Sequence, residues 1–278
     1  MKKIISFVIV TVMLLAGIAF FAFKLSSGTT EASAEVLHYD GATAGNSLLD
    51  VRIPAGVKNV RLPHTAYISY FNTKHRIPNC VIYELTATQV AQCDAPGAEK
   101  RKNYQFNADP MCSASPQWSD YKHSGYDRGH MAPAADMKWS KVAMDESFLM
   151  TNICPQVKSL NSGIWHRLEQ RVREWAARDS SIIVVCGPIF TPGKPVEQIG
   201  EIGVAVPHRF FKALYAPGRN IGIAFIFDND KVKGELRKYA VTIDSVERET
   251  GLDLFYNLPD DIENEVENQC NYKLWEKR

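Results

Sequence analysis

The sequence predicts an α+β fold with a mixed or antiparallel sheet at its core, and three observations support this prediction. Short runs rich in Val, Ile, Phe and Tyr, bounded by Gly, Pro and Asn, are typical of strands. One long amphipathic segment in the middle of the chain is typical of a helix with one buried face. Strand-like and helix-like segments do not alternate regularly, which disfavours a doubly wound parallel sheet.

The strand-like runs define the predicted sheet. They fall at residues 67–71, 81–86, 182–186, 210–215 and 221–227. Each is short, apolar and ended by residues that favour turns, so each is predicted to be a strand.

The clearest helix is predicted over residues 163–177. Its apolar positions recur at spacings of three and four, which places them on one face of a helix; they are Ile164, Leu168, Val172 and Trp175. Asn161 and Ser162 precede this segment and are candidate N-cap residues. Shorter helices are predicted at 244–250, ending at Gly251, and at 260–269.

The first 34 residues are predicted to be a signal peptide or membrane anchor with a linker. Lys2 and Lys3 precede an apolar run over residues 4–23, and this order is typical of an export signal. The run is also long enough to span a bilayer, so a cleaved signal and a retained membrane anchor both stay open. Either alternative predicts an exported protein, periplasmic or extracellular. Residues 25–36 are predicted to be a flexible linker.

One domain is predicted from residue 40 to residue 278, because no second linker and no repeat follows. Six cysteines in an exported chain predict disulfides, although the sequence does not choose their pairing. Cys80 and Cys93 are close enough in the chain to close one loop, whereas Cys154 and Cys186 lie in apolar surroundings typical of core residues.

The charge balance argues against a protein that holds nucleic acid by overall charge. Lys and Arg number 32 and Asp and Glu number 31, which gives a net charge of +1. Proteins of that kind are strongly basic. Any affinity for nucleic acid must therefore come from a local patch of basic residues.

The segment most informative about chemistry runs from residue 126 to residue 175. It contains Asp127-Arg128-Gly129-His130, then Asn152-Ile153-Cys154-Pro155-Gln156, then Asn161 directly before the predicted helix. These three elements, in this order and spacing, resemble the DNA/RNA non-specific endonuclease family, to which the Serratia-type nuclease and endonuclease G belong. The resemblance covers about 200 residues, and its specific motifs lie in the central part.

The resemblance implies a ββα-metal (His-Me) finger within the α+β domain and a metal-dependent endonuclease that cuts DNA and RNA. It implies that His130 is the general base, a role that an imidazole can fill near neutral pH. It implies that Asn161 is the metal ligand, with Mg²⁺ expected and Mn²⁺ or another divalent cation open, since an amide oxygen suits a hard cation. Glu169 would bind the metal through water. No organic cofactor is expected.

Further residues take their roles from matching family positions. Arg128 and Arg173 would contact phosphate or order the site, and Asn152 would lie near the catalytic cluster. Arg101 is assigned as the arginine that stabilises the transition state, with Lys102 as the alternative alignment; lysine would lack the two-pronged hydrogen bonding of arginine. Asp127 is interpreted as an orienting or structural partner. The resemblance also leaves a homodimer open.

Two other functions compete with the nuclease. The same fold could serve a nucleic-acid-binding or uptake protein, or a phosphodiesterase that acts on small phosphate esters. The remaining histidines lack partners at metal-ligand spacing and are interpreted as structural; they are His38, His64, His75, His123, His166 and His208. Trp165 and Trp175 are expected in the core.

Overall fold

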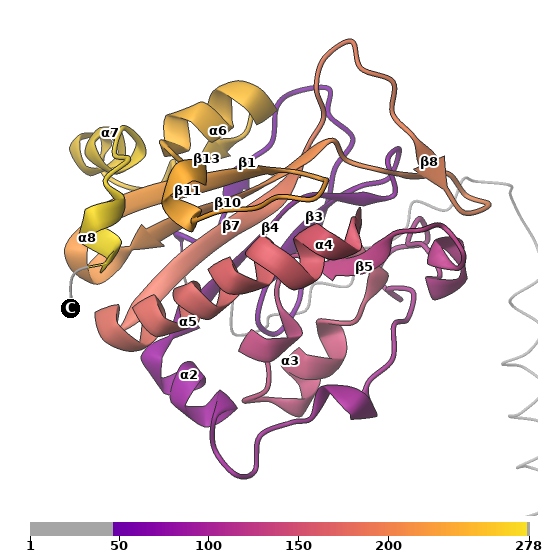
Figure 1. The fold of residues 1–278 in the computed structure, drawn as a ribbon, viewed down its shortest axis with the longest axis horizontal. Helices are drawn as coiled ribbons and strands as arrows, with labels where there is room; N and C mark the ends of the chain where they lie inside the picture. The colour runs from indigo at the N-terminus through magenta and orange to yellow at the C-terminus, as the bar shows by residue number, and fades with distance from the viewer. Residues whose placement is uncertain (1–46, 277–278) are drawn as a thin grey trace, which may run out of the picture. The chain divides into compact units, whose positions relative to one another are not determined.

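The fold is organised around a seven-stranded antiparallel sheet with the order β12-β11-β10-β7-β4-β3-β2 (Figure 1). The structure, a computed structural model, describes residues 47–276. The strands are β2 (Val60–Pro63), β3 (Ile68–Asn72), β4 (Ile77–Thr86), β7 (Ser181–Ile189), β10 (Arg209–Ala216), β11 (Ile221–Asp228) and β12 (Ala240–Val241). The sheet confirms the predicted α+β class, and each predicted strand overlaps an observed one.

Three two-stranded ladders lie outside this sheet. They are β1 (Val51–Arg52) with β13 (Asp253–Leu254), β8 (Gln198–Ile199) with β9 (Val204–Ala205), and β5 (Asp127–His130) with β6 (Ile153–Gln156). The β5–β6 ladder matters most for function, because it carries the Asp-Arg-Gly-His sequence.

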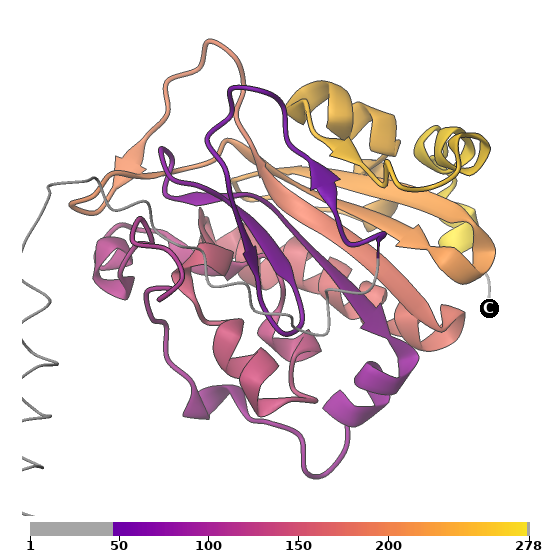
Figure 2. The ribbon, with the colours of Figure 1, turned by 180° about the vertical axis from the view of Figure 1, so that it is seen from behind.

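Helices cover both faces of the central sheet. On one face lies α5 (His166–Asp179), whose Leu168 and Val172 pack with Phe210 of β10 in the larger apolar cluster. On the other face lie α6 (Ile243–Thr250) and α7 (Asp260–Glu267), as Figure 2 shows from behind. The alternation of side chains along each strand supplies both faces with apolar groups, since successive residues point to opposite sides.

The remaining helices are short and lie around this core. They are α2 (Ala87–Cys93), α3 (Lys141–Glu146), α4 (Lys158–Leu160), α8 (Tyr272–Glu276) and the 3₁₀ turns η1 (Arg101–Asn103), η2 (Trp118–Tyr121), η3 (Ala134–Asp136), η4 (Met150–Asn152), η6 (Pro217–Arg219) and η7 (Leu236–Tyr239). The predicted helix before Gly251 is α6. Its N-cap is Thr242, whose side chain accepts a hydrogen bond from Ser245 N, and its C-cap is Gly251, which has a φ of 73°.

The predicted N-cap at Asn161 is wrong. The chain passes from α4 through a π-helical segment, η5 (Asn161–Trp165), into α5, with a kink at Gly163, whose φ of −105° and ψ of −114° are not helical. Asn161 has φ −54° and ψ −54°, whereas an N-cap residue leaves the helical region. Wide turns of this kind occur often at functional sites.

The predicted disulfides are also wrong, since all six cysteines are free thiols. Cys80 packs in the apolar cluster on the α6 side of the sheet. Cys93 ends α2, which packs on the α5 side, and its thiol donates a hydrogen bond to Asp136 O at 3.5 Å. The two sulfur atoms are thus separated by the sheet, although their residues are close in sequence. Cys154 and Cys186 are core residues, as predicted.

The predicted targeting segment at residues 4–23, the linker at 25–36 and His38 lie outside the described residues. Within residues 47–276, no helix combines the length and apolar character that crossing a membrane requires.

Candidate active site

A ββα unit carries the residues singled out by the sequence. In its antiparallel ladder Gly129 pairs with Cys154 and His130 pairs with Ile153, and the chain then enters α4, η5 and α5. Position 129 has no room for a side chain: a Cβ there would lie 2.0 Å from Gln156 Oε1. The glycine before His130 is therefore required by the close approach of the Gln156 side chain, which is itself fully buried.

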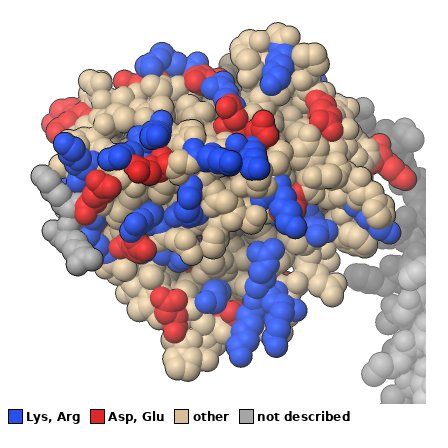
Figure 3. Space-filling view, in the orientation of Figure 1, with Lys and Arg blue, Asp and Glu red and all other residues tan. Residues whose placement is uncertain are grey.

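One cavity of about 580 Å³ lies between the ladder and the helix. Four of the predicted site residues line it: Arg101, His130, Asn161 and Glu169. Figure 3 shows the face on which α5 lies, where basic and acidic side chains are interleaved and one group of basic side chains lies together in the lower part. This pattern agrees with a local basic patch and not with a strongly basic protein.

His130 is 7% exposed and lies among aromatic side chains. Its ring centroid lies 5.3 Å from that of Phe106 and 5.0 Å from that of Phe148. Its Nε2 atom has no hydrogen-bond partner among the described residues. Burial, together with the charges of Arg101 and Arg128, lowers the pKa of His130 to about 3. The imidazole is therefore neutral at physiological pH and can accept a proton at Nε2.

The same two phenylalanines hold the two arginines near His130. The Arg101 guanidinium lies 5.4 Å from the Phe148 ring centroid, and that of Arg128 lies 4.7 Å from the Phe106 centroid. Both distances are those of cation–π contacts. Arg101 lines the cavity, whereas Arg128 does not.

Asp127 determines how the Asn161 amide is turned. Asn161 Nδ2 donates a hydrogen bond of 2.9 Å to Asp127 Oδ2. Because the nitrogen is held there, the amide oxygen is the atom turned away from Asp127. Asp127 therefore orients the side chain of Asn161, in agreement with its interpretation as an orienting partner.

The donor set fits a hard divalent cation. The cavity presents the amide oxygen of Asn161 and the carboxylate of Glu169, and Mg²⁺ and related ions prefer oxygen ligands of these kinds. Burial raises the pKa of Glu169 to about 7, with Lys212 and Arg173 opposing the rise and Asp136 adding to it. A cation in the cavity would compensate the cost of a carboxylate so poorly solvated.

Arg173 lies behind the cavity and not on its wall. Its Nη1 donates a hydrogen bond of 2.8 Å to Asp136, which is fully buried and also accepts a hydrogen bond of 3.1 Å from Tyr83. Glu169 shares the same helix, one turn earlier. Arg173 is thus a structural neighbour of the site, and its predicted contact with phosphate is not supported by this position.

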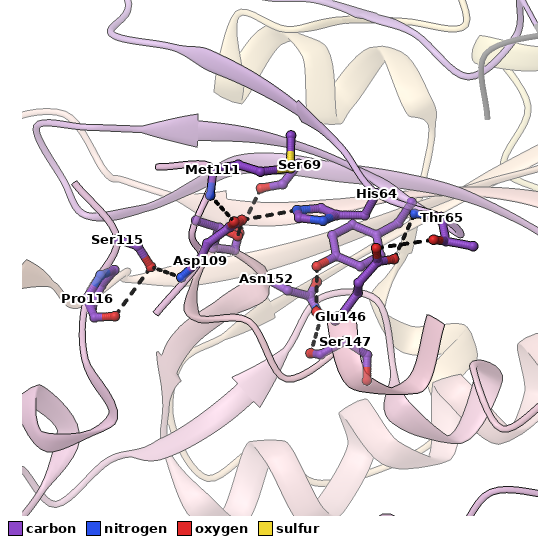
Figure 4. Close-up of polar contacts among 12 residues, drawn as sticks. His64, Thr65, Ser69, Asp109, Met111, Ser115, Pro116, Glu146, Ser147 and Asn152 are labelled. Carbon is purple, nitrogen blue, oxygen red and sulfur yellow. Dashed lines mark hydrogen bonds and ion pairs between the residues drawn. The ribbon is translucent and has the colours of Figure 1, made fainter. Parts of the chain in front are cut away.

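Asn152 is fully buried and does not line the cavity. Its Oδ1 accepts a hydrogen bond from Ala132 N at 2.8 Å, and its Nδ2 donates to Ala132 O at 2.9 Å and to Ser147 O at 2.8 Å. The two bonds to Ala132 clamp the backbone just after His130, and Figure 4 shows the bond to Ser147. The side chain therefore holds the backbone that follows His130.

A second buried network lies next to that clamp (Figure 4). His64 Nε2 lies 3.1 Å from Asp109 Oδ2, and Thr151 Oγ1 donates to the same carboxylate at 2.5 Å. Ser69 Oγ donates to Thr151 O at 2.7 Å, which ties β3 to the turn that contains Asn152. His64 is structural, as predicted.

The clamp predicts a large stability effect for Asn152→Leu. The new side chain is of similar size but leaves three buried backbone groups unpaired, so we expect the free energy of unfolding to fall by about 3 kcal/mol or more. Urea unfolding followed by circular dichroism measures this. Asn107→Leu, at an exposed position, is the control and should change stability by about 0.5 kcal/mol at most. Equal urea midpoints for the two variants would show that the Asn152 hydrogen bonds do not stabilise this backbone.

Three side chains near the site were not predicted. Lys212 is fully buried on β10, with its Nζ 4.6 Å from the Trp165 ring centroid, and it lowers the pKa of Glu169. Asp136 is buried beside Arg173. His166 lines the cavity, whereas the sequence predicts a structural role for it. Only His166 carried a usable sequence signal, because it lies three residues before Glu169 and so on the same helix face.

The chain resembles known nucleases over most of its length. Residues 44–261 match the model of the DNA/RNA non-specific endonuclease family. The mitochondrial nuclease of Saccharomyces cerevisiae is 35% identical over 216 residues, 69% of this chain and 64% of the relative. The mitochondrial nuclease EXOG of Homo sapiens is 31% identical over 276 residues, 92% of this chain and 72% of the relative. A chain in the crystal structure of the EndoG/EndoGI complex, on the mechanism of EndoG inhibition, superposes with a TM-score of 0.68 at 29% identity, covering 72% of this chain and 86% of that one.

These relatives correct the predicted location. Both named proteins are mitochondrial nucleases, which contradicts the expectation of a periplasmic or extracellular protein. The prediction rested on an apolar segment after two lysines, and that pattern does not distinguish between membranes or compartments.

The match to the family model spans well over half of the chain, and the ββα unit carries its motifs in the expected order. The chain belongs to the DNA/RNA non-specific endonuclease family.

Proposed function

We propose that this protein is a divalent-cation-dependent endonuclease that hydrolyses phosphodiester bonds of DNA and RNA without sequence preference. The observation that carries the proposal is that Arg101, His130, Asn161 and Glu169 line one cavity. Hydrolysis requires an activated water, stabilisation of charge on the phosphorane and help for the leaving oxygen. His130 offers a base, Arg101 a positive charge, and the other two side chains oxygen ligands for a metal ion.

In the proposed mechanism His130 Nε2 takes a proton from the attacking water. The atom is free to do so because it has no hydrogen-bond partner among the described residues. Phe106 and Phe148 hold the imidazole, and Asn152 holds the backbone that follows it. Arg101 binds the phosphate, and its planar guanidinium matches two phosphate oxygens at once.

Asn161 and Glu169 would hold the cation, the first through its amide oxygen and the second through water. When bound, a divalent cation supplies Lewis-acid stabilisation of the phosphate and of the leaving 3′-oxygen. Asp127 keeps the amide oxygen in place by accepting the Asn161 N–H. Glu169 must be ionised to help hold the cation, and its raised pKa of about 7 makes cation binding sensitive to pH.

The proposal is tested by incubating the purified protein with plasmid DNA and with a long RNA, with Mg²⁺, with Mn²⁺ and with EDTA. We expect both polymers to be cut in the presence of a cation and neither to be cut in EDTA. Binding without cutting would favour a nucleic-acid-binding or uptake protein. Hydrolysis of a small aryl phosphodiester, with no cleavage of DNA or RNA, would favour a small-ester phosphodiesterase.

The buried lysine next to the site yields a pH-dependent prediction. In Lys212→Met the pKa of Glu169 should rise from its value of about 7, because the positive charge of Lys212, which lowers this pKa, is removed. A smaller fraction of Glu169 is then ionised at pH 7. We expect the Mg²⁺ concentration for half-maximal activity to increase roughly 3- to 10-fold at pH 7.

The same variant should approach the wild type at pH 9, where Glu169 is ionised in both proteins. Methionine fits the apolar surroundings of Lys212, which limits the damage to folding. Lys194→Met, at an exposed loop position, is the matched control. A deficit of equal size at pH 7 and pH 9 would show that Lys212 does not act through Glu169.

A further inference from the structure

A second group of carboxylates lies on the opposite face of the sheet from the cavity. Asp244 and Glu247 come from α6, and Glu267 is the last residue of α7. One oxygen atom from each side chain lies within 4.8 Å of one from each of the others. Val246 and Val266 of the same helices pack into the apolar cluster on this side, so the carboxylates lie between two helices fixed on the sheet.

Glu267 points to a missing ligand. It is 8% exposed, and its Oε1 atom has no hydrogen-bond partner among the described residues. A carboxylate withdrawn from water in this way is costly unless a partner compensates it. Within residues 47–276, none of the three carboxylates forms an ion pair with Lys or Arg.

The charges around the group do not compensate it. Asp253 and Glu263 add to the negative potential, and Arg52, which acts on Glu263, pairs with Asp253. Burial, reinforced by the neighbouring carboxylates, raises the pKa of Glu267 to about 8. Burial also raises the pKa of Glu247 to about 7, although Glu247 Oε1 accepts a hydrogen bond from Leu254 N at 2.6 Å.

We propose that Asp244, Glu247 and Glu267 bind one Ca²⁺ ion that joins α6 to α7. Ca²⁺ binds carboxylate oxygens at about 2.3–2.6 Å, so two ligand atoms on the same ion lie up to about 5 Å apart, which accommodates this group. Mg²⁺ seldom uses an all-protein set of carboxylates and keeps most of its water. The site is separate from the catalytic cavity, and its role is to stabilise the packing of the two helices.

Thermal unfolding of the full chain after treatment with EGTA tests the proposal. A ligand that binds only the folded protein raises its Tm, and for a protein of this size we expect a rise of about 5–10 °C at a Ca²⁺ concentration about 100 times the dissociation constant. The rise should be much smaller with Mg²⁺ at equal concentration. Wild-type protein whose Tm does not respond to Ca²⁺ at pH 8 would overturn the proposal and leave a group of protonated carboxyls.

Three variants assign the response to this site. Glu267→Gln keeps the shape of the side chain but removes its charge, so the Ca²⁺-dependent rise in Tm should disappear. Its Tm in EGTA should be at least that of the wild type, since the variant no longer buries a charge. Glu265→Gln, exposed on the same helix, should keep the full rise. Asn161→Ala, altered in the catalytic cavity, should also keep it. A rise that survives in Glu267→Gln, or that is lost in Asn161→Ala, would contradict the assignment.

Discussion

Replacing His130 by alanine is expected to lower the rate of DNA and RNA cleavage by about two to four orders of magnitude. Removal of a general base has an effect of this size, because the attacking water keeps its proton in the transition state. The measurement is the initial rate of plasmid nicking at saturating Mg²⁺. The cation should still bind, since its proposed ligands are Asn161 and Glu169, so the Mg²⁺ concentration for half-maximal residual activity should not change.

The control for this variant is His123→Asn. His123 is exposed, does not line the cavity and has a φ of 58°, a conformation that asparagine tolerates. The activity of His123→Asn should match that of the wild type. If His130→Ala were to cut DNA within a few-fold of the wild-type rate, His130 would not be the base, and His166 on the same cavity wall would become the first alternative.

Replacing Asn161 by alanine is expected to reduce activity by at least two orders of magnitude at about 1 mM Mg²⁺, because the variant loses the amide oxygen proposed as the direct ligand. Unlike the His130 variant, it should recover part of its activity as the cation concentration is raised. Cation titration of the cleavage rate distinguishes the two cases. Ser162→Ala, the adjacent residue on the same cavity wall, should require the same cation concentration as the wild type.

A related variant separates the ligand from its orienting partner. Asp127→Asn weakens the hold on Asn161 Nδ2 without removing the amide oxygen. Its need for cation should fall between those of the wild type and Asn161→Ala. A cation requirement in Asn161→Ala equal to that of the wild type would exclude Asn161 as the ligand.

Much of the fold was predictable because its signals are local. The strands of the central sheet are dense in β-branched and aromatic residues, and α6 carries both a Thr N-cap and a terminal glycine. The two-residue strands and the short helices α2 and α3 lack a comparable period or length. The disulfide prediction failed for a related reason: Cys80 and Cys93 are close in sequence, but their side chains lie on different sides of the sheet.

The site residues that belong to a sequence motif could be predicted, whereas those whose place depends on burial could not. Asp-Arg-Gly-His and Asn161 stand out in the sequence, and the structure brings His130 and Asn161 to one cavity. Lys212 lies inside the apolar strand Arg209–Ala216, and nothing in that run indicates that it faces Glu169. The difference between Arg101 on the cavity wall and Asn152 behind it depends on packing, which sequence spacing does not reveal.

The most direct test of the central claim is a crystal structure of the protein with Mn²⁺, located by its anomalous scattering. We expect a peak in the cavity lined by His130, at direct ligand distance from Asn161 Oδ1 and linked to Glu169 through water. A fully occupied Mn²⁺ bound elsewhere, with Asn161 still held by Asp127 and the cavity filled only by water, would contradict it.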